Sequence, residues 1–341
     1  MMEQTPEELV MDFIKKETFY LMVLLFVVIV VGTQTYHLFK HSEDLATDVQ
    51  TLGHDSDQNR LKKMETRWAA LDVGNPLVPP FAGAVKQLER MVLAIGGVII
   101  VLAALAWIVR GRLLQGHELR LPAWGLWDVL KTAGMLAAGG LLFGLIFKSY
   151  DPEAKETSHA LAQIFSGILA VGVMIHVVLV ERGGRLRDLG FRRGGLRQSI
   201  ALGILGVLFV MPFLALFHYV GPEITIQQPL HTLLFTRSKT TLALAGVSAI
   251  IVAPIAEELL FRGLLLPALQ RWMNRTAAIV LSALFFAAGH IDLFVFLPML
   301  ALGLVMGYLY DRTRSIAAPL AMHMTYNGLV ILGVFARRTL L

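Results

Sequence analysis

The sequence contains no cysteine and has few charged residues for its length. The absence of cysteine excludes disulfide bonds, catalytic thiols and thiolate metal ligands. Charged residues make up 16% of the chain, against about 25% in an ordinary soluble domain. Hydrophobic residues make up 56% of the chain, and its mean hydropathy is +0.64. These values predict a multi-pass membrane protein.

Several familiar catalytic motifs are also missing. The chain has no HExxH pattern, in which two histidines one helical turn apart bind zinc, and no glycine-rich phosphate loop. It has no GxSxG pattern, which places a nucleophilic serine on a sharp turn. The pI near 9.5 is typical of membrane proteins with basic cytoplasmic loops, so we expect no nucleic-acid partner.

About nine apolar runs approach the length of roughly 20 residues that a membrane-spanning helix needs. They predict an all-α fold, a polytopic transmembrane helix bundle of about eight or nine spans in the cell membrane. The run at 277–290 is the short one. The runs cover residues 19–39, 91–109, 129–147, 161–180, 200–217, 241–266, 277–290, 294–310 and 316–335.

The chain divides into three parts. Residues 1–90 are expected to form an N-terminal anchor helix and a hydrophilic loop segment, residues 91–235 further helices of the bundle, and residues 236–341 a core that carries polar residues. Lys and Arg favour the cytoplasmic side of a membrane protein, and their distribution predicts a cytoplasmic N-terminus. The Arg-rich segment 181–197 is expected to lie against anionic headgroups on that side.

Two adjacent carboxylates, Glu257 and Glu258, lie inside the apolar run 241–266. A charged group near the centre of a bilayer costs about 3 kcal/mol on insertion scales, so two in succession indicate a functional site. Polar residues recur at helical spacing in the following apolar runs, and a lesser set, 311–315, lies at a helix end. The residues that recur at this spacing are Phe286 with His290, and His323 with Asn327.

Helical geometry separates the two carboxylates. Glu258 and Arg262 are four residues apart and share a helix face, which predicts an ion pair and a supporting, structural role. Glu257 points about 100° away and lacks that partner. Because different surroundings give two carboxylates different acid and base roles, Glu257 is the better candidate for a general base. Counted from the cytoplasmic helix ends, the acid, the imidazoles and the amide lie about 12–20 Å inside the membrane, in one layer.

This set of groups fits hydrolysis of an amide bond. Glu257 would deprotonate a water with help from His290, and His323 and Asn327 would stabilise the oxyanion. The same groups could instead bind zinc through two His and a Glu. A third possibility is a non-catalytic membrane protein, either an immunity or scaffold factor or a transporter with Glu257 as its proton site. Polar groups reached mainly from one side disfavour transport.

Three motifs stand in order on successive apolar segments: Glu257-Glu258-x-x-x-Arg262, Phe286-x-x-x-His290 and His323-x-x-x-Asn327. Over residues 240–335 this arrangement resembles the CAAX-protease and bacteriocin-processing family. The resemblance implies an all-helical intramembrane glutamic endopeptidase that needs no metal cofactor, although older descriptions of the family call its members metalloproteases. It implies Glu257 as the base, His290 as a holder of the water, His323 and Asn327 as the oxyanion site, and a peptide or membrane-protein substrate in the lipid bilayer.

Overall fold

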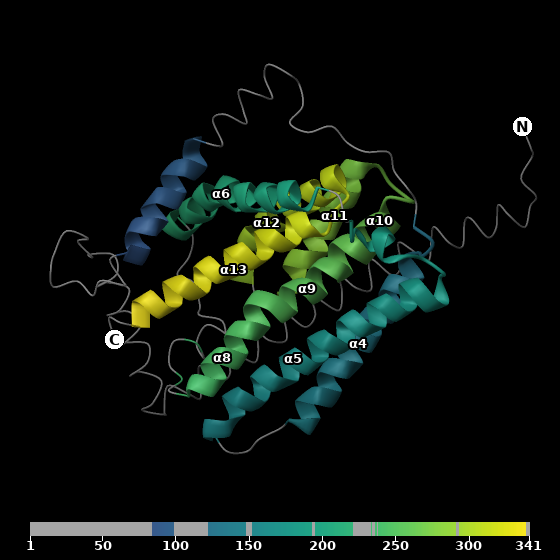
Figure 1. Cartoon of the computed structure of the whole chain (residues 1–341), viewed down its shortest axis with the longest axis horizontal. Coiled ribbons are helices and arrows are strands. Elements are labelled where there is room, and N and C mark those ends of the chain that lie inside the picture. Colours follow the sequence, from purple (N-terminus) through teal and green to yellow (C-terminus); the bar gives the residue numbers. More distant parts are fainter. Residues whose placement is uncertain are drawn as a thin grey trace, which may run out of the picture.

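The computed structural model describes residues 84–98, 122–147, 152–192, 195–220, 233, 236, 238–290 and 293–338 (Figure 1). Every regular element in these residues is a helix, which confirms the predicted all-α class. The predicted span at 19–39, most of the run at 91–109 and nearly all of the 1–90 segment lie outside the described residues. A helix over 84–98 is described across the boundary between the first two predicted parts.

The first half of the described bundle consists of three long helices and two short segments. A π-helical segment, η1, extends α5, and a 3₁₀ turn, η2, leads into α6. The bounds are α4 Leu126–Ile146, α5 Pro152–His176, η1 Val177–Glu181, η2 Leu186–Leu189 and α6 Leu196–Val220.

The second half begins with one long helical segment that changes its register twice. Two π-helical stretches, η3 and η4, interrupt this segment on either side of α9. The bounds are α8 Lys239–Val247, η3 Ser248–Val252, α9 Ala253–Glu258, η4 Leu259–Leu265 and α10 Leu266–Leu269. Three further helices follow, α11 Arg275–Ala288, α12 Leu293–Thr313 and α13 Ala317–Arg338.

Among the described residues, 6 helices are long and apolar enough to cross a membrane. The α11 helix is apolar but has only 14 residues, as the short run at 277–290 predicted. The chain is therefore a multi-pass membrane protein, while the predicted total of eight or nine spans is not confirmed. The 6 spans are Leu126–Ile146, Ala154–Glu181, Leu196–Ala215, Lys239–Leu269, Val295–Thr313 and Ala317–Arg338.

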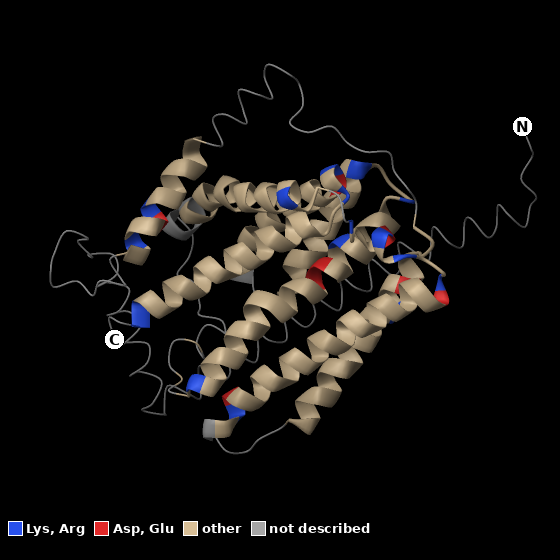
Figure 2. Cartoon of the chain, viewed as in Figure 1, with Lys and Arg blue, Asp and Glu red and all other residues tan. Residues whose placement is uncertain are grey.

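Charged side chains gather at the ends of the helices, whose middle parts are almost free of them (Figure 2). The exception is acidic and lies part-way along the α8–α10 segment, where α9 ends in Glu257 and Glu258. Since such a position is costly for a carboxylate, residues of this segment and of its neighbours must supply compensating groups.

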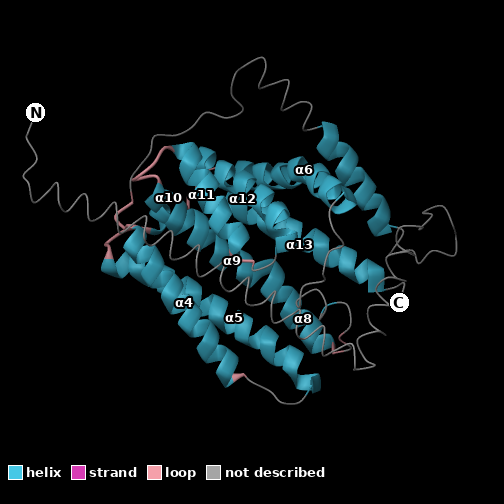
Figure 3. Cartoon of the chain, turned by 180° about the vertical axis from the view of Figure 1, so that it is seen from behind, coloured by secondary structure: helices cyan, strands magenta, loops and turns pink. Residues whose placement is uncertain are grey.

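The α8–α10 segment runs between the α4–α5 pair and α13 (Figures 1 and 3). On the far side of α13, α6 packs closely because a glycine faces it: a Cβ on Gly203 would lie 2.4 Å from the carbonyl oxygen of Ala318. Gly303 on α12 lies against Ala283 on α11 in the same way. Small residues at such crossings let the helix backbones approach, as membrane helices commonly do.

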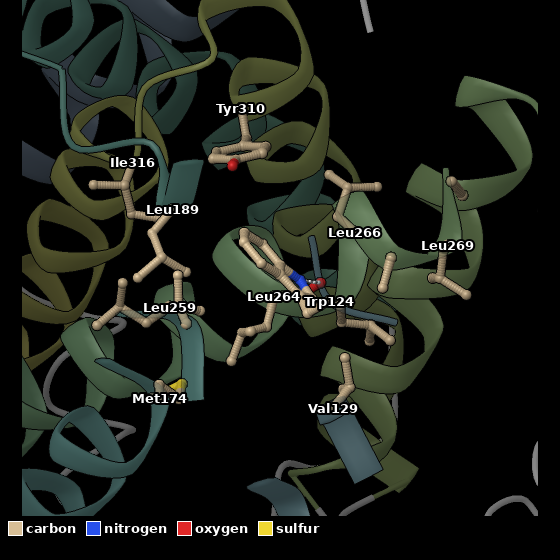
Figure 4. Close-up of a cluster of buried hydrophobic side chains, with 14 of the residues drawn as sticks. Trp124, Val129, Met174, Leu189, Leu259, Leu264, Leu266, Leu269, Tyr310 and Ile316 are labelled. Atoms are coloured by element: carbon tan, nitrogen blue, oxygen red, sulfur yellow. Dashed lines mark hydrogen bonds between the residues drawn. The ribbon is translucent and has the colours of Figure 1, made fainter. Parts of the chain in front are cut away.

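A cluster of buried apolar side chains holds the α10 end of this segment in place (Figure 4). At its centre the fully buried Trp124 donates a hydrogen bond from Nε1 to the carbonyl oxygen of Leu264, 3.0 Å away. Leu264 belongs to η4, so a residue 140 positions earlier in the chain fixes the segment just after the two carboxylates. The packing therefore positions Glu257 and Glu258 from outside their own helix.

Candidate active site

Glu258 forms a fully buried ion pair with Arg262. The Glu258 Oε1 and Arg262 Nη1 atoms lie 2.8 Å apart, and both side chains are 0% exposed. Arg262 also donates from Nη2 to the carbonyl oxygen of Gly303 at 3.3 Å. Its guanidinium carbon lies 4.4 Å from the centre of the Phe286 ring, in cation–π geometry. The ion pair predicted from the four-residue spacing is present, and α12 and α11 help to hold it.

His323 of α13 lies against both carboxylates. Its Nδ1 donates to Glu258 Oε1 at 2.9 Å, and its Nε2 lies 3.9 Å from Glu257 Oε2. A carboxylate can only accept hydrogen bonds, so this contact requires a proton on Nδ1. The contact between His323 and Glu258 was not predicted, because spacing within one helix says nothing about a partner 65 residues away.

Phe286 connects the two histidines. Its ring centre lies 4.8 Å from that of His290 and 5.7 Å from that of His323. His290 Nδ1 contacts the carbonyl oxygen of Phe286 at 2.9 Å. Because that oxygen only accepts, Nδ1 carries the proton, and in the neutral ring Nε2 keeps a lone pair that can accept a proton or a hydrogen bond.

Glu257 is the more accessible of the two carboxylates. Its side chain is 32% exposed, whereas that of Glu258 is 0% exposed. Its Oε2 atom is nevertheless buried and accepts no hydrogen bond from any described residue. A reachable carboxylate with an unsatisfied buried oxygen beside an imidazole is suited to bind a polar ligand such as water.

Asn327 lies on the same face of α13 as His323, four residues on. Its Nδ2 donates to the carbonyl oxygen of Ala249 in η3 at 2.7 Å. The structure thus brings Glu257, the two histidines and the Asn327 amide to one region where α9, α11, α13 and η3 meet. Their proposed roles in catalysis remain predictions.

The predicted site does not form a metal-binding cluster. Across the described ranges, no group of three His, Asp or Glu side chains converges as a ligand set. Glu258 Oε1 is already occupied by Arg262 and His323, whereas Glu258 Oε2 has no partner among the described residues. The metal-free interpretation and the zinc alternative both stay predictions, and no step below depends on a metal.

The lesser polar set at 311–315 forms a separate buried network at the C-terminal end of α12. Asp311 is 1% exposed, accepts from Gln270 Nε2 at 2.8 Å, and accepts from Arg314 Nη2 at 3.2 Å. Burial lowers the pKa of the Arg314 guanidinium, and the nearby Asp311 charge opposes that shift. This network ties the end of α10 to the α12–α13 turn.

The chain is similar to membrane peptidases. The sequence model of the family described as "Type II CAAX prenyl endopeptidase Rce1-like" matches residues 239–329, a range that contains every predicted site residue. The chain is 29% identical over 212 residues to the Bacillus subtilis (strain 168) protein named "Putative membrane peptidase YdiL". The matched region covers 60% of this chain and 84% of that protein. No solved structure matches the chain. Both matches agree with the resemblance drawn from the three motifs.

Proposed function

We propose that the chain is a member of the CAAX-protease and bacteriocin-processing family, and that it is an intramembrane endopeptidase that uses Glu257 to activate water. The observation that carries this proposal is the unequal state of the two adjacent glutamates. Glu258 is buried and ion-paired, while Glu257 is 32% exposed and lies 3.9 Å from an imidazole nitrogen. An accessible carboxylate held beside fixed proton donors and acceptors is the arrangement that a general base needs.

The attacking water is held by two acceptors. Glu257 Oε2 has no hydrogen-bond donor among the described residues, and His290 offers the lone pair of Nε2 because its Nδ1 donates to Phe286. Glu257 takes one proton from the water while the oxygen attacks the carbonyl carbon of the scissile peptide bond. The protonated Glu257 then returns that proton to the leaving amine, so the carboxylate is regenerated.

The oxyanion of the tetrahedral intermediate is stabilised by Asn327 and His323. One N–H of the Asn327 amide is used by the Ala249 carbonyl, and the second, which has no acceptor among the described residues, can donate to the oxyanion. Donation from His323 Nε2 requires a second proton on the ring, and the carboxylates of Glu257 and Glu258 lie beside the ring to balance its charge. One such donor is worth about 3 kcal/mol of barrier.

We further propose that cleavage takes place in or at the border of the bilayer, on a peptide or membrane-protein substrate, with the N-terminus of the enzyme in the cytoplasm. The depth of Glu257 within an apolar segment supports the first point. The description of the matching family as a CAAX prenyl endopeptidase makes a prenylated CAAX peptide the first substrate to test. We propose no metal cofactor and no nucleic-acid partner.

The test is cleavage of a fluorogenic peptide panel, with and without a prenyl group, by the purified protein in liposomes. The variants Glu257→Gln and His290→Ala should abolish or strongly reduce cleavage while remaining folded. Glu181→Gln is the matched control, because it makes the same chemical change at an exposed carboxylate outside the site. Full activity of Glu257→Gln, or proton-coupled flux that depends on Glu257, would contradict the proposal.

A further inference from the structure

The Asn327 amide is held by a backbone carbonyl that the helix itself has released. In a regular α-helix the carbonyl oxygen of Ala249 would accept from the N–H of residue 253. Here the N–H of Ala253 bonds instead to Ser248, five residues back. Ala249 therefore loses its usual donor, and its carbonyl oxygen accepts from Asn327 Nδ2 at 2.7 Å.

Pro254 removes the other donor that the Ala249 carbonyl could have used. If the π register of η3 continued by one residue, the N–H of residue 254 would bond to Ala249. Residue 254 is a proline, which has no N–H and whose ring also clashes with the carbonyl four residues earlier in an α-helix. The proline therefore both favours the wider register and leaves the Ala249 oxygen without any backbone donor.

The released carbonyl fixes the direction of the Asn327 side chain. The Nδ2 group has two N–H donors in the plane of the amide, so binding one of them to Ala249 aims the other. Ala249 and Ile331, one turn beyond Asn327, pack in the same apolar cluster, which keeps η3 and α13 in contact at this point. Rotation of the amide away from Ala249 would leave a carbonyl unsatisfied, which is unfavourable where no backbone donor replaces it.

We propose that Pro254 is a positioning residue that acts through Ala249 to orient Asn327 for oxyanion binding. This inference rests on the proposed function, because it needs Asn327 to donate to the oxyanion. Pro254 itself contacts neither water nor substrate in this scheme. Substitution by alanine would restore an N–H and let η3 relax toward α-helical register, so that backbone donors compete with Asn327 for the same oxygen.

Pro267 provides a matched control on the same segment. It also follows a π-helical stretch, because the N–H of the preceding residue, Leu266, bonds to Phe261 five residues back. It is buried, as Pro254 is. Its stretch contacts Trp124 through Leu264 rather than Asn327. Pro267→Ala therefore changes the helix in the same chemical way at a site that does not orient the amide.

The experiment is a double-mutant cycle on kcat and KM in liposomes, with Pro254→Ala and Asn327→Ala alone and combined. Asn327→Ala should lower kcat about 10²- to 10³-fold, the usual effect of losing an oxyanion donor. Pro254→Ala alone should lower kcat by about tenfold or more with KM nearly unchanged, since it misdirects the same donor. In the Asn327→Ala background, Pro254→Ala should change kcat less than about twofold, because no amide is left to orient.

Pro267→Ala should reduce kcat by the same factor in both backgrounds. Pro254→Gly restores the same N–H in a more pliable backbone and replaces Pro254→Ala in the cycle if that variant does not fold. Equal effects of the Pro254 substitution with and without Asn327 would overturn the positioning role. Glu257→Gln separates the two proposals: if it is inactive and the cycle is additive, only the positioning role fails, whereas an active Glu257→Gln removes the proposed function itself.

Discussion

The two adjacent glutamates should respond in opposite ways to the same substitution. Glu258→Gln keeps the shape of the side chain but removes the charge that balances Arg262, which is 0% exposed. Leaving one partner of a buried ion pair without compensation typically costs about 3–5 kcal/mol. Glu257→Gln removes a charge that is 32% exposed and has one ionic contact, at 3.9 Å, so its cost should be about 0–1 kcal/mol.

Stability can be followed by the fluorescence of tryptophan during unfolding with denaturing detergent. The chain has 5 tryptophans, of which Trp124 is fully buried against the η4 segment, so replacing the other four with Phe makes the emission report loss of packing next to the site. Peptide cleavage measured on the same samples gives activity. We expect Glu257→Gln to be stable and inactive, and Glu258→Gln to be strongly destabilised. Glu181→Gln, which breaks an exposed ion pair with Lys131, should cost no more than about 1 kcal/mol and leave cleavage unchanged.

A double substitution tests the electrostatic origin of the effect. Glu258→Gln combined with Arg262→Met removes both buried charges, and replacing a whole buried pair is far less costly than breaking it. The double variant should therefore be more stable than Glu258→Gln alone. The reasoning is refuted if Glu258→Gln unfolds within 1 kcal/mol of the wild type, or if Glu257→Gln is the more destabilised of the two single variants.

Three further predictions concern packing and cofactors. Gly203→Val should destabilise the fold by about 1–3 kcal/mol through overpacking, because a Cβ there would lie 2.4 Å from the Ala318 oxygen; Gly134→Ala, where a Cβ meets nothing within 4 Å, should not destabilise it. Trp124→Phe should cost about 1–3 kcal/mol of unfolding free energy, since it leaves the buried Leu264 carbonyl unsatisfied; its unfolding is followed by loss of helical circular dichroism, because the substitution removes the buried fluorophore, and an unchanged midpoint would contradict this. Chelators should leave peptide cleavage unchanged, and inhibition that added zinc reverses would show a metal requirement.

Much of the site could be predicted from sequence because its members are spaced by helical periods. The pairing of Glu258 with Arg262 and the shared face of His323 and Asn327 follow from four-residue spacing within one helix. Apolar runs likewise predicted the helices, and seven of those runs coincide with helices in the described residues, the long α8–α10 segment among them. The count of spans could not be confirmed in the same way, because two of the runs lie wholly or mostly outside the described residues.

Contacts between helices could not be predicted, because spacing along one helix does not reveal what lies opposite. His323 was expected to stabilise the oxyanion together with Asn327, yet it also donates to Glu258, 65 residues earlier. The π-helical register of η3 was not predicted either, although Pro254 is the residue in the sequence that indicates it. Each residue added to a helical turn rotates everything beyond it by about 100°, so two π-helical stretches decide which groups face one another.

The sequence alone determined that this chain is an all-helical membrane protein with two acids embedded among apolar residues, since composition and periodicity are local properties. Only the tertiary structure decided that one acid is neutralised by Arg262 and His323 while the other stays accessible, and that the Ala249 carbonyl holds the amide. The physical reason is that burial and hydrogen-bond pairing depend on how separate helices pack, and that packing turns two neighbouring, chemically identical side chains into groups with different tasks.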